Sequence, residues 1–285
     1  PANKEILQEA GLLTDAVKDA GPSDIMVVVQ ARKTTELDAA IENCRLQLAG
    51  TDTAAAAADA QTSVPASSLG MGMAAGDGAN LAQISVPGAY AAAEALKALK
   101  LGLNVFMFSD NVPLEQEVVI KREATRRGLL VMGPDCGTAI IGGIPLGFAN
   151  AVRPGNIGVV AASGTGLQEV TTQIHRMGGG VSQAIGTGGR DLYAQVGGAT
   201  MLQGIALLAK DPATDVIAIV SKPPAPEVAA RVMTALEAAG KPAVVLFLGS
   251  APLKTRGARV RQAHTLVDCA ALAVKASGAR RAVSA

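Results

Sequence analysis

The stretch IGVVAASGTG, residues 157–166, gives the clearest indication of the fold. Its first five residues are apolar or glycine, which is typical of a strand buried on both faces of a parallel sheet. The glycines that follow allow a tight turn. A helical pattern then begins at Gly166, with Leu167, Val170 and Ile174 on one side. A strand, a glycine-rich turn and a helix in this order indicate a βαβ unit.

Short β-branched runs alternate with longer Ala- and Leu-rich segments along the rest of the chain, which predicts parallel sheets covered by helices. The predicted strands are Asp24 to Gln30, Leu81 to Val86, Val105 to Ser109, Leu129 to Met132, Ile157 to Ala161, Val216 to Val220 and Ala243 to Leu248. The predicted helices are Thr35 to Ala49, Tyr90 to Lys100, Glu115 to Arg127, Gly166 to Met177, Ala199 to Ala209, Pro226 to Ala239 and Thr265 to Ala276.

Two breaks interrupt this alternation. Residues 51–80 are small, polar and rich in helix breakers, which predicts a mobile loop. Arg153-Pro154-Gly155-Asn156 interrupts the pattern again, just before a new strand begins. We therefore predict an α/β protein of two parallel-sheet domains, residues 1–150 and 151–285.

Composition excludes several classes of function. The 285 residues are 49% hydrophobic, enough for two cores, and 25 basic against 24 acidic residues give no footprint for nucleic acid. Cys44, Cys136 and Cys269 are too scattered for a disulfide framework or a C-x-x-C metal pair, so we expect a reducing compartment and no metal. No long apolar run and no basic cleavable leader is found, so we expect a soluble, cytoplasmic protein without a membrane partner.

Four loops are interpreted as falling after strands and should gather at the carboxyl edge of the sheets, where open α/β folds bind ligands. Two of them carry cations. Lys222 and Arg190 stand beside glycine or proline rather than on a helix face, which favours ligand contact over the solvated position that such cations ordinarily take. A third loop, Ser163-Gly164-Thr165, offers hydroxyls and helix-start amides to an anion, although the same residues suit a plain turn with a hydroxyl cap.

The fourth loop is Gly133-Pro134-Asp135-Cys136-Gly137-Thr138. Asp135 is a candidate for orienting a neighbour or for a general-base step. Cys136 is either a nucleophile or a small buried thiol beside Gly137, and we favour the buried thiol. Gly137, Gly188 and Gly189 complete the predicted substrate-binding residues.

The order of these motifs resembles the α subunit of succinyl-CoA synthetase across nearly the whole chain. The resemblance implies a Rossmann-like domain over residues 1–150 and a flavodoxin-like, ligase-CoA-type domain over residues 151–285. Three longer strings resemble the FdrA family within that superfamily. The strings that carry the synthetase resemblance are Val86-Pro87, Asp110 to Pro113, Gly133 to Gly137, Gly155 to Val159, Ser163 to Thr165 and Ile185 to Gly189. The strings that carry the FdrA resemblance are Met107 to Pro113, Gly128 to Thr138 and Val220 to Ala225.

Departures from the synthetase pattern concern its CoA loop and its phosphohistidine. The synthetase has a glycine-rich CoA loop after its first strand, but the corresponding turn here, residues 30–35, has no glycine. Lys222 stands where the synthetase has a glutamate that steadies the phosphohistidine. The segment Lys254 to Ala263, where that histidine is expected, has none. His264 precedes a sequence with capping-box spacing, so we interpret it as flanking a helix start. His175 is interpreted as a residue of a predicted helix.

The FdrA resemblance implies a component of oxamate carbamoyltransferase, which converts oxalurate and phosphate to oxamate and carbamoyl phosphate in purine and allantoin catabolism. On this hypothesis Ser163, Gly164 and Thr165 bind phosphate, while Arg190 and Lys222 hold the anionic substrate or polarise its carbonyl. Phosphate or carbamoyl phosphate is then a substrate, no cofactor is required, and CoA binding is not expected. FdrA relatives are longer, which implies a hetero-oligomer with a second FdrA half or a separate β-like subunit.

Two alternatives stay open. The first is the α-type subunit of an ADP-forming acyl-CoA synthetase whose nucleotide-grasp portion lies elsewhere, and tight CoA binding would favour it. The second is a non-catalytic scaffold subunit, which anions would not stabilise against heat.

Overall fold

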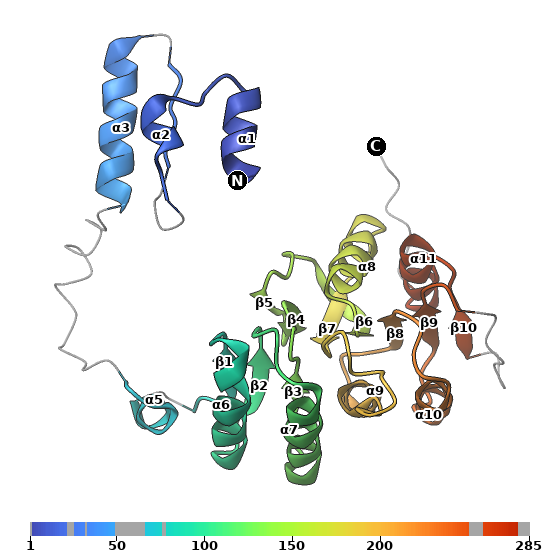
Figure 1. Ribbon diagram of the computed structural model, residues 1–285. Helices are drawn as coiled ribbons and strands as arrows, with labels where there is room; N and C mark the ends of the chain where they lie inside the picture. Colours follow the sequence, from blue (N-terminus) through green and yellow to red (C-terminus); the bar gives the residue numbers. More distant parts are fainter. Residues whose placement is uncertain are drawn as a thin grey trace. The chain divides into compact units, whose positions relative to one another are not determined.

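The chain divides into two compact units. The structure is a computed structural model that describes residues 2–21, 26–31, 33–48, 66–75, 78–250 and 259–278 (Figure 1). The units are Pro1–Pro65 and Ala66–Ala285. This division does not coincide with the predicted boundary at residue 150, because a hairpin before that residue, β4 (Thr138–Ile141) and β5 (Ile144–Gly147), joins the sheet formed by later residues through β7 (Val181–Gly186).

The first unit is helical in its described part. It contains α1 (Ala2–Glu9), α2 (Asp15–Lys18) and α3 (Thr34–Leu48), of which α3 was predicted. Residues 26–31 form no strand, and residues 22–25 and 32 lie outside the described residues. The prediction of a strand from Asp24 to Gln30 is therefore wrong over its described residues. The described part of this unit offers no neighbouring strand with which a β-branched run could pair.

The predicted loop at 51–80 lies mostly outside the described residues, which here begin again at Ala66. Inside it, α5 (Leu69–Ala75) is a helix that the sequence analysis missed. A small parallel sheet follows, in the order β1 (Leu81–Ile84), β2 (Asn104–Met107) and β3 (Val131–Met132). Helices α6 (Gly88–Lys100) and α7 (Leu114–Arg127) pack against one face of it, through residues such as Ala95 and Ile120.

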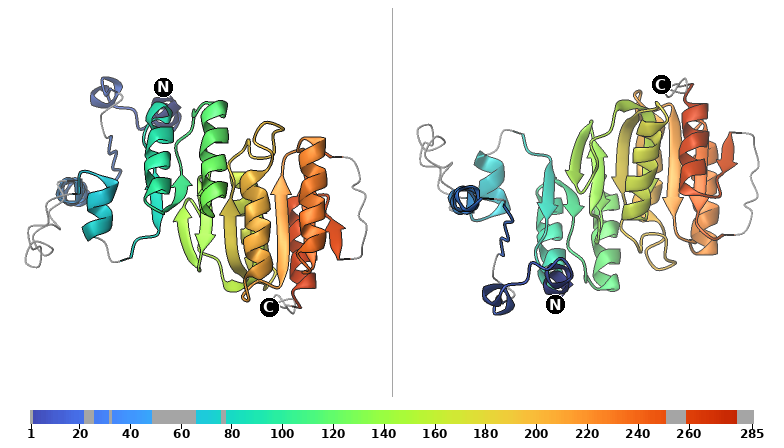
Figure 2. Two further views of the ribbon diagram at one scale, coloured as in Figure 1. Left: turned by 90° about the horizontal axis from the view of Figure 1, so that it is seen from below. Right: turned by 90° about the horizontal axis from the view of Figure 1, so that it is seen from above.

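The large sheet has the strand order β10-β9-β8-β6-β7-β4-β5. Its first five strands are parallel, whereas β4 runs antiparallel to both β7 and β5. Helices α8 and α11 cover one face and α9 and α10 cover the other (Figures 1 and 2). The elements not yet given bounds are β6 (Pro154–Ala161), α8 (Gly164–Arg176), α9 (Ala199–Lys210), β8 (Val216–Ser221), α10 (Pro226–Ala238), β9 (Ala243–Phe247), β10 (Val260–Gln262) and α11 (Leu266–Ala276).

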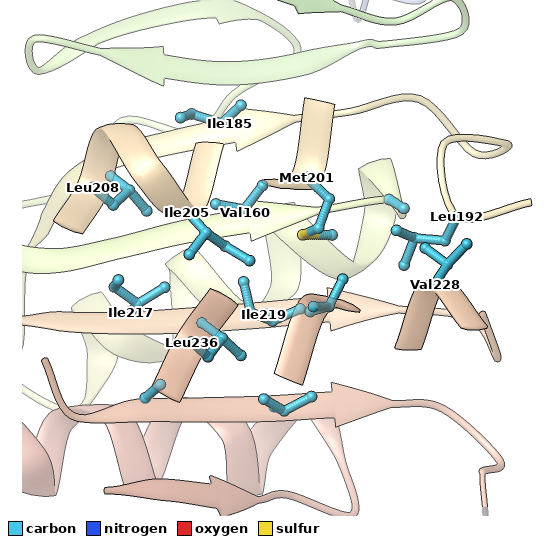
Figure 3. Packing of buried hydrophobic residues seen from close by; sticks show 14 of the residues in the cluster. Val160, Ile185, Leu192, Met201, Ile205, Leu208, Ile217, Ile219, Val228 and Leu236 are labelled. Carbon is cyan, nitrogen blue, oxygen red and sulfur yellow. The ribbon is translucent and has the colours of Figure 1, made fainter. Parts of the chain in front are cut away.

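The central strands are apolar on both faces because both faces are covered. In β8, Ile217 and Ile219 belong to the core under α9 and α10, whereas Ala218 and Val220 belong to the core under α8 and α11. Figure 3 shows the first of these cores, in which Leu236 lies over the strands. The predicted α/β fold with parallel sheets is confirmed. Within the described ranges, no helix is long and apolar enough to cross a membrane.

Candidate functional site

The topology of the large sheet has a switch point between β6 and β8. From β6 the chain passes through α8 to β7, and from β8 it passes through α10 to β9 on the other side. Because α8 and α10 cover opposite faces, ligands are expected at the carboxyl ends of β6 and β8. Ser163–Thr165 follow β6 and Lys222 follows β8, and the Ala162 amide donates to the Val220 carbonyl at 2.9 Å. The fold thus brings these two predicted loops together.

Ser163 caps the helix that starts at this point. Its Oγ accepts a hydrogen bond from the Gly166 amide at 3.2 Å, so the plain-cap interpretation holds for this hydroxyl. Gly164 and Thr165 are exposed in the first turn of α8. The amides of a first helical turn have no partner within the helix and lie at the positive end of its dipole. This turn therefore presents anion-binding groups to the edge of the sheet.

Thr165 opens onto a polar hollow of about 510 Å³. Asn150, Gln168, Glu169, Thr172 and Leu266 also line it. The Gln168 side chain donates to Thr138 Oγ1 at 2.8 Å and to the Phe148 carbonyl at 3.3 Å, which ties α8 to the β4–β5 hairpin. The sequence analysis missed Gln168 and Thr172. Their signal was the three- to four-residue spacing of polar side chains that starts at Thr165.

Lys222 is exposed at the end of β8, and within the described part of the chain it forms no ion pair or hydrogen bond. Its ammonium group is therefore available to a ligand. Arg190 is placed differently, because its Nη2 donates to the Val112 carbonyl at 2.7 Å and pairs with Glu117 Oε2 at 2.9 Å. The predicted cations thus differ in how firmly the fold holds them.

Behind Arg190 lies a buried cluster of charges, which we call the α7 cluster: Glu117, Lys121 and Asp191. Lys121 Nζ lies 2.7 Å from Asp191 Oδ1 and 3.0 Å from Glu117 Oε1, and it donates to the Thr187 carbonyl at 2.9 Å. Asp191 also accepts from the amides of Met201, at 2.8 Å, and of Thr200, at 3.2 Å, so it caps α9. The cluster fixes the loop after β7 against α7 and α9.

The sequence analysis missed Glu117 and Lys121. Their spacing is that of the buried face of α7, which they share with Ile120 and Ala124. Charged residues at positions of an apolar stripe are the signal that could have found them.

The loops that end β3 and β7 meet through their backbones. A Cβ on Gly188 would collide with the Pro134 carbonyl, and one on Gly186 would lie 2.5 Å from both Cys136 Sγ and the Thr138 carbonyl. Asp135 is exposed, and its Oδ2 lies 4.0 Å from where a Cβ of Gly189 would be. The structure therefore brings Asp135 beside Gly189 and Cys136 beside Gly186, whereas Gly137 lies against Phe148 and Phe108.

Cys136 is 3% exposed in this junction. Burial raises the pKa of its thiol to about 11, so the thiolate that a nucleophile requires is scarce near neutral pH. This supports the interpretation of Cys136 as a buried thiol.

Both histidines take part in structural hydrogen bonds. The backbone amide of His264 donates to Asp268 Oδ2 at 2.9 Å, while Thr265 Oγ1 accepts from the Asp268 amide at 3.0 Å. The predicted helix start after His264 is thus confirmed. His175 Nδ1 accepts from the Arg153 amide at 2.9 Å. Part of the segment expected to hold a phosphohistidine, residues 254–258, lies outside the described residues. Among described residues, no group of His, Cys, Asp and Glu is placed to hold a metal ion.

Comparisons with known proteins find relatives of the part of the chain that forms this edge of the sheet. A family model described as a CoA binding domain matches residues 152–249, which contain the turn after β6 and Lys222. Malate–CoA ligase subunit alpha of Methylorubrum extorquens is 27% identical over 191 residues, covering 63% of this chain and 61% of that protein. The chain resembles the α subunits of CoA ligases. The SauD subunit of the ADP-forming sulfoacetate-CoA ligase of Bilophila wadsworthia is 30% identical over 151 residues, covering 50% of each protein.

Other matches extend over more of the chain. The uncharacterized protein YahF of Escherichia coli K12 is 45% identical over 288 residues, covering 98% of this chain and 53% of that protein. The chain thus spans about half to three fifths of the length of these relatives. A model described as the AllF heavy metal-associated domain matches residues 1–65, which the sequence analysis had assigned to a Rossmann-like domain.

Solved structures share the fold. The ATP citrate lyase of Methanothrix soehngenii, solved with citrate and coenzyme A, gives a TM-score of 0.58 at 22% identity over 74% of this chain and 37% of that one. A dinucleotide-forming acetyl-coenzyme A synthetase of Ca. Korarchaeum cryptofilum gives 0.51 at 20% identity, over 73% and 42% of the two chains.

These findings correct two predictions. The carbamoyltransferase hypothesis is wrong, because the relatives with a named activity are ADP-forming and other CoA ligases. The expectation that CoA does not bind is also wrong, because residues 152–249 match a CoA binding domain. The error came from the glycine-free turn at residues 30–35, which was interpreted as the loss of the CoA site, whereas the match surrounds the glycine-rich turn after β6. The resemblance to succinyl-CoA ligase α subunits is supported, and the finer FdrA assignment stays a prediction.

Proposed function

We propose that this chain is the CoA-binding, α-type part of an ADP-forming acyl-CoA ligase. The observation that carries the proposal is the first turn of α8, which follows the glycine-rich turn at the switch point of the sheet and lies inside residues 152–249. CoA carries phosphate groups, and helix-start amides at a switch point suit them. The chemistry of these groups therefore fits the ligand that the family match names.

In this proposal the amides of Gly164 and Thr165 bind phosphate oxygens of CoA, and Ser163 keeps the turn in shape as the cap. Lys222 is available to the carboxylate of the acid that becomes the thioester, since no partner in the described part of the chain competes for its ammonium group. CoA supplies the thiol that accepts the acyl group from an acyl phosphate, and the phosphate that leaves derives from the ATP used on the partner. Lys222 would stabilise negative charge that develops on the acyl oxygen.

The junction of the loops after β3 and β7 forms the acyl side of the proposed site. Gly188 lets the two backbones approach closely, and Cys136 packs against Gly186 in the same junction. Asp135 is exposed there and orients the acid or its water. Cys136 acts by packing, because its thiol is protonated near neutral pH.

The acid substrate is proposed from the relatives' names. Malate, succinate and sulfoacetate each carry two acidic groups. We therefore propose a small acid with a second anionic group as the substrate of this chain.

The nucleotide-binding part is proposed to lie on a partner. The relatives with a named activity are named as subunits, and the chain spans about half to three fifths of their length. A hetero-oligomer, or the remainder of a longer protein, would then supply the site where ATP is used.

The test is an assay of the chain together with the subunit that co-purifies with it. ATP, CoA and a panel of acids that includes malate, succinate and sulfoacetate are supplied, and acyl-CoA and ADP are detected. We expect a thioester to form, and Lys222→Ala to lower kcat/KM at least about tenfold. The matched control, Lys210→Ala, changes an exposed lysine at the end of α9 and should leave the rate unchanged. Absence of any thioester from an assembly that binds ATP would refute the proposal.

A further inference from the structure

Arg190 is anchored from behind while part of it faces the edge of the sheet. Its side chain is 34% exposed, and its recorded partners are the Val112 carbonyl and Glu117 Oε2, both held by Nη2. Arginine has N–H donors on three nitrogens. Those on Nε and Nη1 have no partner among the described residues. A cation with free donors is thus held in a fixed position.

Glu117 is the residue that holds it. The Glu117 side chain is 1% exposed, and its second oxygen, Oε1, pairs with Lys121 at 3.0 Å. Neither oxygen makes a hydrogen bond of regular geometry within the described part of the chain, so the two ion pairs compensate its buried charge. Lys121 continues the cluster to Asp191, which caps α9. The side chain of Arg190 is therefore held, through Glu117, Lys121 and Asp191, by helices α7 and α9.

Such an anchor matters for binding, because a flexible arginine must lose rotamer freedom when it binds a ligand. An arginine that the fold already holds loses less. The α7 cluster together with Arg190 is also neutral, with two carboxylates against two cations. An incoming anion would thus meet the free donors of Arg190 without opposition from an excess of buried negative charge.

Position suggests which anion this is. Of the four loops at the carboxyl edge, only those after β7 and β8 contain a cation, Arg190 and Lys222. The proposed reaction needs one cation at the carboxylate that becomes the thioester. Arg190 lies in the loop whose Gly189 faces Asp135, on the acyl side of the proposed site. The second cation is then available for the second acidic group.

We propose that Arg190 binds the second anionic group of the acid and that Glu117 is the positioning residue that holds it there. This inference rests on the proposed function and deepens it. Arg190 and Glu117 together then determine that the site prefers acids with two anionic groups over acids with one.

The experiment measures acid binding to the full chain in the presence of saturating CoA. Succinate, malate and sulfoacetate are titrated against butyrate, which has the length of succinate but a single charge. For the wild type we expect at least one dianion to bind ten times or more tighter than butyrate, the size of a charge-assisted contact. Arg190→Gln should abolish this preference without changing the affinity for CoA.

Two further variants separate positioning from charge. Glu117→Gln should weaken dianion binding about tenfold, while Glu115→Gln, at an exposed position of the same helix, should change nothing. Arg190→Lys keeps the charge but lacks the fork that Glu117 and Val112 hold, so we expect it to restore only part of the preference. It also tests the anchor if Glu117→Gln does not fold.

Each outcome is decisive. A wild type that binds CoA but does not distinguish dianions from butyrate overturns this inference and the proposed dianionic substrate, and leaves the proposed CoA-binding role intact. An Arg190→Gln variant that keeps the preference also overturns it, as does an Arg190→Lys variant that binds like the wild type. A chain that binds no CoA refutes the proposed function itself.

Discussion

The buried Lys121 gives the sharpest test of the physical account. Its side chain is 2% exposed and its ammonium group pairs with Glu117 and Asp191. Lys121→Met keeps the length of the side chain but leaves two buried carboxylates without this cation. Removing one partner of a buried ion pair costs about 3–5 kcal/mol, because the remaining charge stays out of water. We expect a loss of this size in the free energy of unfolding.

A matched control is available on α6. Lys97 pairs with Glu94 at 2.7 Å, as close as the contact between Lys121 and Asp191, but the Lys97 side chain is 62% exposed. An exposed pair contributes about 0–1 kcal/mol, so Lys97→Met should be nearly neutral. Both variants are compared with the wild type by urea unfolding followed by circular dichroism. For a unit of this size, each kcal/mol of lost stability lowers Tm by about 2–4 °C.

A second variant tests the reason for the loss. Adding Glu117→Leu to Lys121→Met removes one of the two carboxylates that have lost their lysine partner, while Asp191 keeps its hydrogen bonds to the amides of α9. The double variant should therefore be more stable than the sum of the single losses, by about 0.5–3 kcal/mol. Strict additivity, or a Lys121→Met loss no larger than that of Lys97→Met, would refute the reasoning.

Three further predictions concern other parts of the chain. Gly188→Ala should cost about 1–3 kcal/mol or more, because φ is +84° and a Cβ would meet the Pro134 carbonyl, whereas Gly189→Ala has open space and should be tolerated; thermal unfolding of the pair checks this. Iodoacetamide at pH 8 should modify the half-buried Cys44 well before Cys136, whose pKa near 11 keeps its thiol protonated until the pH rises far higher; equal rates by mass spectrometry would contradict this. Thr265→Ala should cost about 1 kcal/mol in urea unfolding through the lost cap of α11, and an unchanged midpoint would argue against the cap.

The strands that could be predicted are those buried on both faces. The runs in β6, β8 and β9 are continuously apolar because helices cover both sides of them. The sequence analysis missed β7, whose Ser182 and Gln183 interrupt the apolar pattern. Ser182 is nevertheless buried, since its hydroxyl meets that of Thr214 at 2.7 Å. A buried polar residue whose hydrogen-bond partner lies far along the chain cannot be recognised from the sequence around it.

The place of the candidate site was predictable, because the carboxyl ends of parallel strands lie at the same edge of a sheet. The loops after β6, β7 and β8 had to meet once the strand order was set, whatever their ligand. The surroundings of Arg190 were not predictable, because Glu117 and Asp191 are far apart in sequence and meet through Lys121 only in the fold. The ligand itself was misjudged, because the turn at residues 30–35 was treated as the place where CoA would bind.

Titration of CoA into the full chain by calorimetry tests the central claim most directly. Thr165→Glu places a negative charge at the first turn of α8, and Thr234→Glu places the same charge on an exposed position of α10 as the control. We predict that the wild type and Thr234→Glu bind CoA equally, while Thr165→Glu binds it at least about tenfold more weakly. A wild type that does not bind CoA, or a Thr165→Glu variant that binds it as tightly, would contradict the account.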